Sequence, residues 1–80
     1  MRIEFFGQLA EAIWREVELP SARGETVAEV RRRLAALFPA AAETLSRPAV
    51  RACLDDRIVG EEEVVGDGAE LAFLPPLSGG

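Results

Sequence analysis

Residues 73–80 read FLPPLSGG. This stretch indicates both how the folded domain ends and how the end of the chain could function. Pro75 and Pro76 end the apolar strand before them, because proline fixes φ and lacks the N–H that a sheet requires. Two successive prolines also favour a stiff, extended exit from the domain. Gly79 and Gly80 carry no side chain, so the end of the sequence is thin enough to enter a narrow tunnel.

Two interpretations of this end are open. It is an unstructured terminus, as many chain ends are, or it is a working tail. Fully extended, residues 75–80 span roughly 20 Å, which is enough to reach the active site of a neighbouring protein. We therefore predict a folded domain over residues 1–74 and a flexible tail over residues 75–80 that carries a functional carboxylate.

Composition limits the remaining possibilities. Eighty residues, 49% of them hydrophobic, make one small folded domain. The apolar runs are too short for a membrane helix, and the opening residues MRIEFF do not resemble a signal peptide. Cys53 is the single cysteine, which rules out an internal disulfide and favours a cytoplasmic setting.

Charge and missing residue types argue against independent catalysis. The net charge of −5 disfavours nucleic acid or an anionic membrane as a partner and fits basic proteins. All nine basic residues are arginine, so the usual histidine and lysine bases are absent. One cysteine and scattered carboxylates do not build a metal site. We expect no metal and no cofactor bound by this chain.

The first half of the chain predicts strand, short helix, strand and long helix. Residues 2–6 alternate as a strand, residues 8–13 form a short helical connection, and residues 14–19 alternate again. Thr26 and Glu29 form a capping-box pattern that starts a helix. This helix should end near Phe38, before a proline, with a buried stripe of Val27, Val30, Leu34 and Leu37.

The three arginines at 31–33 are the strongest basic cluster in the sequence. We interpret them as a solvated helix flank with an i,i+4 pair between Glu29 and Arg33, in preference to a binding patch.

The second half predicts three strands after a short helical turn at residues 40–46. Residues 50–54 alternate with Val50, Ala52 and Leu54 facing inward. The remaining features are a polar turn at 55–57, a short strand at 58–59, a solvated acidic run at 61–63, a tight turn at Asp67-Gly68 and a final strand at 70–74.

This order predicts an α+β fold, a mixed sheet packed on one main helix. With its terminal Gly-Gly, it resembles the ubiquitin-like β-grasp, in which the first and last strands lie side by side in parallel. That pairing would place Phe6, Ala72 and Leu74, with Leu77, on an exposed apolar patch at the root of the tail. Such a patch marks a protein interface, unless a loop covers it.

Three segments carry a resemblance to a known family. They are FFGQLA at 5–10, DGAELAFLPP at 67–76 and SGG at 78–80. Together they resemble the small subunit of molybdopterin synthase, a MoaD-type sulfur carrier. The family often has Phe directly before Pro-Pro, whereas this sequence has Leu74 there.

The resemblance implies a mechanism centred on Gly80. An E1-like adenylyltransferase would use ATP and Mg²⁺ to adenylate its carboxylate, which is otherwise anionic and resists nucleophiles. A persulfide sulfur from a cysteine desulfurase or a rhodanese-like protein would then displace AMP and leave a thiocarboxylate. The large synthase subunit, in a heterotetramer, would transfer this sulfur to a cyclic pyranopterin precursor.

The resemblance also implies residue roles. Gly79 would lie in the partner's tunnel, and Pro75, Pro76, Leu77 and Ser78 would align the tail. The surface of Phe6, Ala72 and Leu74 would dock on the partner. Cys53 would be a small apolar filler and not a sulfur relay.

Other functions are also open, some with the same activation of the Gly80 carboxylate and one without any chemistry at the tail. The chain could carry sulfur for thiamine thiazole synthesis or for tRNA thiolation. It could be a ubiquitin-like modifier that joins Gly80 to target lysines, or a plain interaction module.

Overall fold

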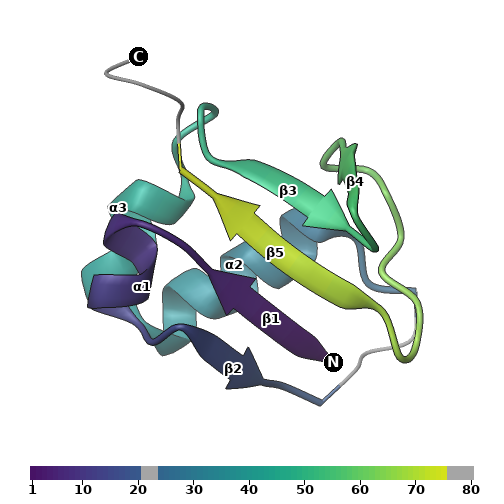
Figure 1. The fold of residues 1–80 in the computed structure, drawn as a ribbon, viewed down its shortest axis with the longest axis horizontal. Coiled ribbons are helices and arrows are strands. Elements are labelled where there is room, and N and C mark those ends of the chain that lie inside the picture. Colours follow the sequence, from purple (N-terminus) through teal and green to yellow (C-terminus); the bar gives the residue numbers. More distant parts are fainter. Residues whose placement is uncertain (21–23, 76–80) are drawn as a thin grey trace.

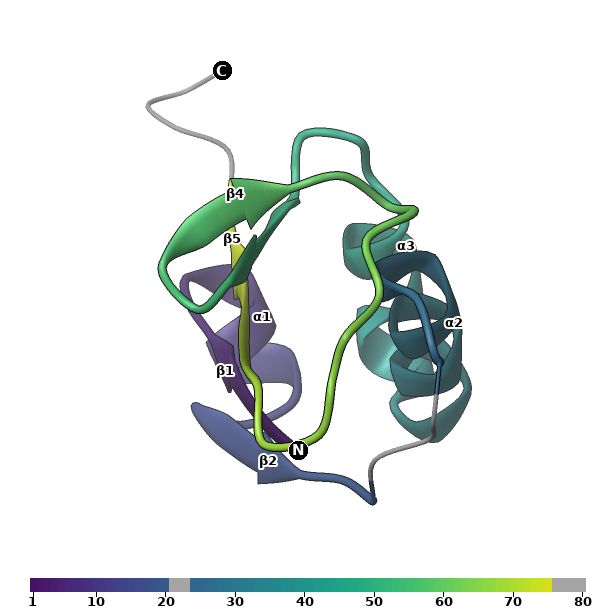
Figure 2. The same ribbon diagram turned by 90° about the vertical axis from the view of Figure 1, so that its right-hand side faces the viewer.

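The computed structural model describes residues 1–20 and 24–75 of the chain. A sheet lies in front of the helices in Figure 1, and Figure 2 shows the sheet and the main helix as two layers. The elements in chain order are β1 (Arg2–Phe5), α1 (Gln8–Ala12), β2 (Glu16–Glu18), α2 (Val27–Leu37), a 3₁₀ turn (Pro39–Ala41), α3 (Ala42–Leu45), β3 (Arg51–Leu54), β4 (Arg57–Val59) and β5 (Glu70–Leu74).

The sheet has five strands in the order β2-β1-β5-β3-β4. β1 and β5 are parallel neighbours, with Ile3 opposite Leu71 and Phe5 opposite Phe73, while the other pairs are antiparallel. A mixed sheet on one main helix, with the first and last strands parallel, confirms the predicted α+β class and the β-grasp arrangement.

The core lies between the sheet and α2. Alternate residues of β1 and β5 point into it, and the rings of Phe5 and Phe73 stack with centroids 6.1 Å apart. Burying aromatic side chains of this size contributes strongly to the stability of so small a domain. Within the described residues no helix has the length and apolar character needed to cross a membrane.

The capping box that starts α2 is confirmed. The Thr26 N–H donates to Oε1 of Glu29 at 2.9 Å, and the Glu29 N–H donates to Oγ1 of Thr26 at 3.3 Å. These bonds satisfy two N–H groups that the first turn of a helix leaves without partners.

Two expectations about α2 were wrong. The Glu29 carboxylate is engaged by Thr26, and Arg33 pairs with Glu25 at 2.9 Å instead of Glu29. Leu37 is 53% exposed, not buried. At about 100° per residue it lies about 50° to one side of the middle of the buried stripe, and Phe38, on the other side of that middle, packs on the core in its place.

The solvated interpretation of the arginine cluster and of the acidic run was also wrong in one respect. Arg31 points between the layers and forms an ion pair with Glu61, and Arg33 pairs with Glu25, so two of the three arginines and one of the three acidic residues have an ion-pair partner.

The edge strands differ slightly from their predicted bounds. β2 is shorter than the predicted segment 14–19, and β4 begins one residue earlier than predicted, at Arg57. The predicted turn at Asp55 and Asp56 is present, and both residues have positive φ.

Candidate functional site

The candidate site begins where β5 ends. Leu74 is the last residue of the strand, and Pro75, which is half-buried, is the last residue that the structure describes. The remaining predicted tail residues, Pro76, Leu77, Ser78, Gly79 and Gly80, lie outside the described residues.

Pro75 packs against the backbone of Gly7. A Cβ placed on Gly7 would lie 3.2 Å from both Cβ and Cγ of Pro75, closer than a comfortable contact. Gly7 also has a φ of +62°, a conformation that favours glycine. Glycine is therefore required at position 7 for two reasons, the positive φ and the close approach of Pro75. The turn that follows β1 thus supports Pro75, the first residue of the predicted tail.

Sequence reasoning treated Gly7 only as a strand break. The signal that could have found its second role is the parallel pairing itself, because Phe5 opposite Phe73 brings position 7 beside position 75.

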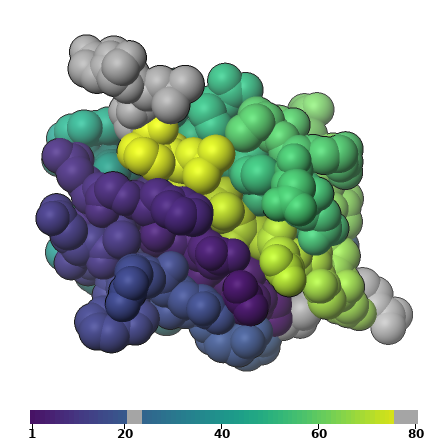
Figure 3. Space-filling view, in the orientation of Figure 1, coloured from purple at the N-terminus to yellow at the C-terminus, as the bar shows by residue number. Residues whose placement is uncertain are grey.

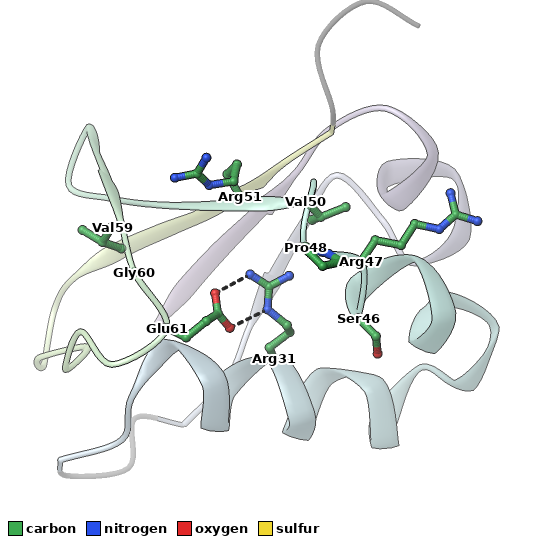
Figure 4. Close-up of a pocket in the computed structure, with 9 residues that line it drawn as sticks. All are labelled: Arg31, Ser46, Arg47, Pro48, Val50, Arg51, Val59, Gly60 and Glu61. Atoms are coloured by element: carbon green, nitrogen blue, oxygen red, sulfur yellow. Dashed lines mark hydrogen bonds and ion pairs between the residues drawn. The ribbon is translucent and has the colours of Figure 1, made fainter. Parts of the chain in front are cut away.

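Beneath the sheet, Arg31 supports the last inward residue of β5. Its guanidinium carbon lies 5.0 Å from the centre of the Phe73 ring. It donates from Nε and Nη2 to the two carboxylate oxygens of Glu61, at 2.9 and 2.7 Å, and from Nη1 to the Leu45 carbonyl at 2.6 Å (Figure 4). Bidentate pairs of this kind fix both partners, so the strand that leads into the tail rests on a rigid support.

A cleft of about 350 Å³ opens beside this ion pair (Figure 4). Arg31 and Glu61 contribute to its wall, and the start of β3 lies above them. In Figure 4, Arg47 and Arg51 extend to opposite sides, so the three guanidinium groups do not converge on one point. The cleft contains no nucleophile poised beside a base.

Of the predicted interface residues, Ala72 and Leu74 lie on the outer face of β5, and Phe6 directly follows Phe5, the last residue of neighbouring β1. Phe6 is 44% exposed, while Ala72 and Leu74 are half-buried on neighbouring β5. The strand register adds two residues to this group, because Cys53 lies opposite both Ala72 and Ile58. The outer-face patch therefore comprises Phe6, Leu74, Ala72, Cys53 and Ile58.

Figure 3 looks onto this face and shows β5 as a strip between β1 and the β3–β4 hairpin. Ile58 is 52% exposed at the far side of the patch. Cys53 is half-buried within the patch and not in the core. Groups of exposed apolar side chains are typical of surfaces that bind other proteins.

Charged side chains flank the patch. Arg51 lies opposite Leu74, and no ion pair to it is formed within the described residues. Toward β2, Arg2 pairs with Glu16 at 3.0 Å and with Glu4 at 3.4 Å. The Glu16 carboxylate is the largest of the causes that raise the pKa of the Arg2 guanidinium.

No group of three or more histidine, cysteine, aspartate or glutamate side chains within residues 1–20 and 24–75 is arranged to hold a metal ion. What the described surface does offer is an apolar patch and, at Pro75, a supported start of the tail.

Comparison with known proteins agrees with this geometry. Residues 3–80 match the family model described as the ThiS family. Among solved structures, SAMP1 from Haloferax volcanii has a TM-score of 0.86 and 26% identity, covering 99% of this chain and 97% of that one.

Two further structures are similar in fold. A putative molybdopterin converting factor subunit 1 from Pyrococcus furiosus has a TM-score of 0.78 at 17% identity, covering 95% of both chains. A chain from the complex of subunits 1 and 2 of the molybdopterin-converting factor from Helicobacter pylori has a TM-score of 0.66 at 19% identity, covering 99% of this chain and 96% of that chain.

Proposed function

This chain belongs to the ThiS family, and from that premise we propose that it is the sulfur-carrier small subunit of a molybdopterin synthase. The family match and the fold by themselves indicate a ubiquitin-like sulfur carrier or modifier with a β-grasp fold. The observation that carries the proposal is the supported tail root, in which Pro75 rests on Gly7 and leads to a terminal Gly-Gly.

The proposed chemistry takes place at Gly80. Its carboxylate attacks the α-phosphate of ATP on an E1-like adenylyltransferase, with release of pyrophosphate, and becomes an acyl-adenylate. A persulfide sulfur attacks the acyl carbon and AMP leaves. Reductive cleavage of the resulting acyl disulfide by a thiol releases the thiocarboxylate and leaves a disulfide behind.

The partners would supply every acid and base. The large synthase subunit would accept the tail, and the sulfur would pass to a cyclic pyranopterin precursor. The molybdenum-cofactor branch is supported by the fold shared with subunit 1 of the molybdopterin-converting factor, which in Helicobacter pylori is in complex with subunit 2. It is also supported by the Pro-Pro exit after an aromatic-containing strand.

A second candidate is a ubiquitin-like protein modifier, which the similarity to SAMP1 favours. The adenylation step would be the same, but a target lysine amine would displace AMP and form an isopeptide bond. The two candidates differ in the product, a free thiocarboxylate or a conjugate of higher mass.

Reconstitution tests the proposal. The chain is supplied as its C-terminal thiocarboxylate with a molybdopterin synthase large subunit and the pyranopterin precursor, and molybdopterin is measured. We expect product with the full chain and none after deletion of Gly79 and Gly80. No product with a large subunit that is active with its own small subunit would contradict the molybdopterin assignment.

Gly79→Ala tests whether the tail must be thin. We expect this variant to fold normally and to lose at least tenfold in activation or sulfur transfer, because a methyl group does not fit a tunnel shaped for glycine. The matched control is Gly66→Ala, since nothing lies within 4 Å of a Cβ at Gly66. Full transfer by Gly79→Ala would show that the tunnel does not exclude a side chain.

A further inference from the structure

The amino groups of the chain decide whether one copy can react with the activated tail of another. Residues 1–80 contain no lysine, because all nine basic residues are arginine. A guanidinium stays protonated at neutral pH and offers no lone pair to an acyl group. The amino group of Met1 is therefore the one amine of these residues that could accept an acyl group.

Met1 is built into the sheet beside β2. Its side chain is 1% exposed and packs against the core, and its amino group donates to the Leu19 carbonyl at 2.8 Å. The Leu19 N–H donates in return to the Met1 carbonyl at 2.9 Å, which extends the antiparallel pairing of β1 with β2 by one residue. The same amino group forms an ion pair with Glu18 at 3.0 Å.

Acylation of this amino group would disrupt both contacts. An ammonium has three N–H groups and a positive charge, whereas the amide nitrogen that acylation leaves has one N–H and no charge. It could donate to the Leu19 carbonyl or to Glu18 but not to both, and the ion pair would be lost. Because the Met1 side chain packs against the core, the amino group cannot turn outward without withdrawing that side chain. The folded chain therefore opposes acylation of its own amine.

Distance alone does not protect the amine from the tail of the same molecule. Met1 precedes Arg2, which lies opposite Glu70, so it lies five residues, or about 17 Å, along the sheet from Leu74. Residues 75–80 span about 20 Å when fully extended, which is long enough to return to the start of β1. A second copy in solution has no such restriction. The contacts of the amine, and not its position, therefore oppose the reaction.

We propose that this chain is excluded as an acceptor of its own activated tail, so that the acyl group of Gly80 passes only to sulfur or to an amine of another protein. In the excluded step the amine nitrogen attacks the acyl carbon of the adenylate, AMP leaves with the bonding electron pair, and the nitrogen loses a proton to give an amide. Copies are then never linked in series, since an attached copy offers no amine to the next. This inference rests on the proposed activation of Gly80 and holds for both candidate functions.

The Cys53 thiol is a further nucleophile that the tests must separate from the amine. It lies half-buried in the outer-face patch, opposite Ala72 and Ile58. Acyl transfer to a thiol gives a thioester, which hydroxylamine cleaves, whereas an amide resists hydroxylamine. Products that survive hydroxylamine therefore report on the amine alone.

The first test measures the Met1 amine without any enzyme. The chain is treated with the N-hydroxysuccinimide ester of acetic acid, and hydroxylamine-resistant acetylation is followed by intact mass. We expect acetylation to be roughly threefold or more slower in buffer than in concentrated urea, because the folded chain must give up a hydrogen bond and an ion pair. Glu18→Gln should narrow this difference, while Glu62→Gln, the same change in an exposed turn, should not. Equal rates in buffer and in urea overturn the protection of the amine.

The second test uses the tail as the acyl donor. The chain is incubated with ATP, Mg²⁺ and the E1-like enzyme of the source organism, without a sulfur donor. ATP–pyrophosphate exchange in the same mixture establishes that Gly80 is activated. The chain is then separated from the enzyme, treated with hydroxylamine and weighed. We expect neither a cyclic product, which is lighter by one water, nor an amide-linked dimer.

Arginine-to-lysine variants provide matched amines. Arg57→Lys on edge strand β4 and Arg32→Lys on α2 keep the charge at exposed positions. We expect the added amine of each variant to be acetylated at similar rates in buffer and in urea, and each variant to form hydroxylamine-resistant dimers in the activated mixture. Thermal unfolding of each variant establishes that it is folded.

Each outcome has one meaning. A cyclic product or an amide-linked dimer of the wild type overturns the inference. Lysine variants that form no dimer also overturn it, because an added amine would then make no difference. Absence of pyrophosphate exchange with the wild type contradicts the proposed carrier function, while the acetylation rates still decide whether the amine is protected. Exchange without dimers, but without molybdopterin in the reconstitution, contradicts only the pathway and supports the inference.

Discussion

Arg31 connects helix α2 to the end of the sheet from which the tail leaves. Its side chain is 13% exposed, and it joins α2 to Glu61, to the Leu45 carbonyl and to the Phe73 ring. Three contacts from one guanidinium hold the helix, a loop and the last strand in one geometry.

We predict that Arg31→Met lowers the free energy of unfolding by about 1–3 kcal/mol, through loss of the ion pair, the carbonyl bond and the cation–π contact. In a domain of this size, chemical denaturation resolves a change of this magnitude. Arg32→Met is the control, because Arg32 is the exposed neighbour on the same helix turn. Equal stabilities of the two variants would contradict the supporting role of Arg31.

Glu29 makes the stability of α2 depend on pH. Hydrogen bonds from the Thr26 backbone and hydroxyl lower the pKa of the Glu29 carboxyl. A carboxyl whose pKa is lower in the folded chain contributes stability above its unfolded pKa of about 4.3, and that contribution is lost as pH falls through the folded pKa.

We therefore predict that Glu29→Gln is less stable than the wild type at pH 7, and that the difference shrinks below about pH 4. The free energy of unfolding of both proteins, measured by urea titration at several pH values, provides the check. A difference that stays constant from neutral to acid pH would show that the carboxylate charge contributes nothing to the cap.

At the scale of elements, the turn between β1 and α1 determines where the tail leaves the sheet. Gly7 combines a positive φ with a close approach to Pro75. Any side chain there strains the backbone and pushes the proline away.

We predict that Gly7→Ala destabilises the domain by about 1 kcal/mol or more and also lowers the rate of adenylation at Gly80. Gly60→Ala is the control for stability, because Gly60 has no positive φ and no atom lies within 4 Å of the position that a methyl group would take there. Thermal unfolding and pyrophosphate exchange measure the two effects. Normal exchange by a folded Gly7→Ala protein would contradict the alignment role of this turn.

The sequence predicted elements better than it predicted contacts. Alternation and the capping box depend on neighbours close along the chain, so β5 and the start of α2 were correct. Arg31 with Glu61, and Gly7 with Pro75, join residues distant in sequence, and local patterns do not encode them. Leu37 was assigned to the core because helical spacing alone does not show where the sheet stops covering the helix.

The candidate site, too, could be predicted from the sequence only in part. The predicted parallel pairing of β1 and β5 is confirmed, while the interface of Phe6, Ala72 and Leu74 that was derived from it stays a prediction. Ile58 was missed, because its place beside Cys53 follows from the register of the β3–β4 hairpin and from no periodicity.

For the molecule as a whole, the outer-face patch predicts where a partner protein binds. Ile58→Glu should weaken binding to the proposed large subunit roughly tenfold, because a charge enters an apolar contact. Val64→Glu is closely matched, since both side chains are 52% exposed but Val64 lies in the loop near Thr26 and not on the outer face. Titration calorimetry of the two variants gives the comparison, and equal affinities would remove Ile58 from the interface.

The parallel pairing of β1 with β5 also decides how the domain bears mechanical load. The two strands run in the same direction, so the start of β1 and the end of β5 lie at opposite ends of the sheet (Figure 1). Tension on the tail, opposed at the start of β1, shears the hydrogen bonds between these strands together and does not peel them apart one by one. A partner can therefore draw the tail taut while the domain that holds it stays folded.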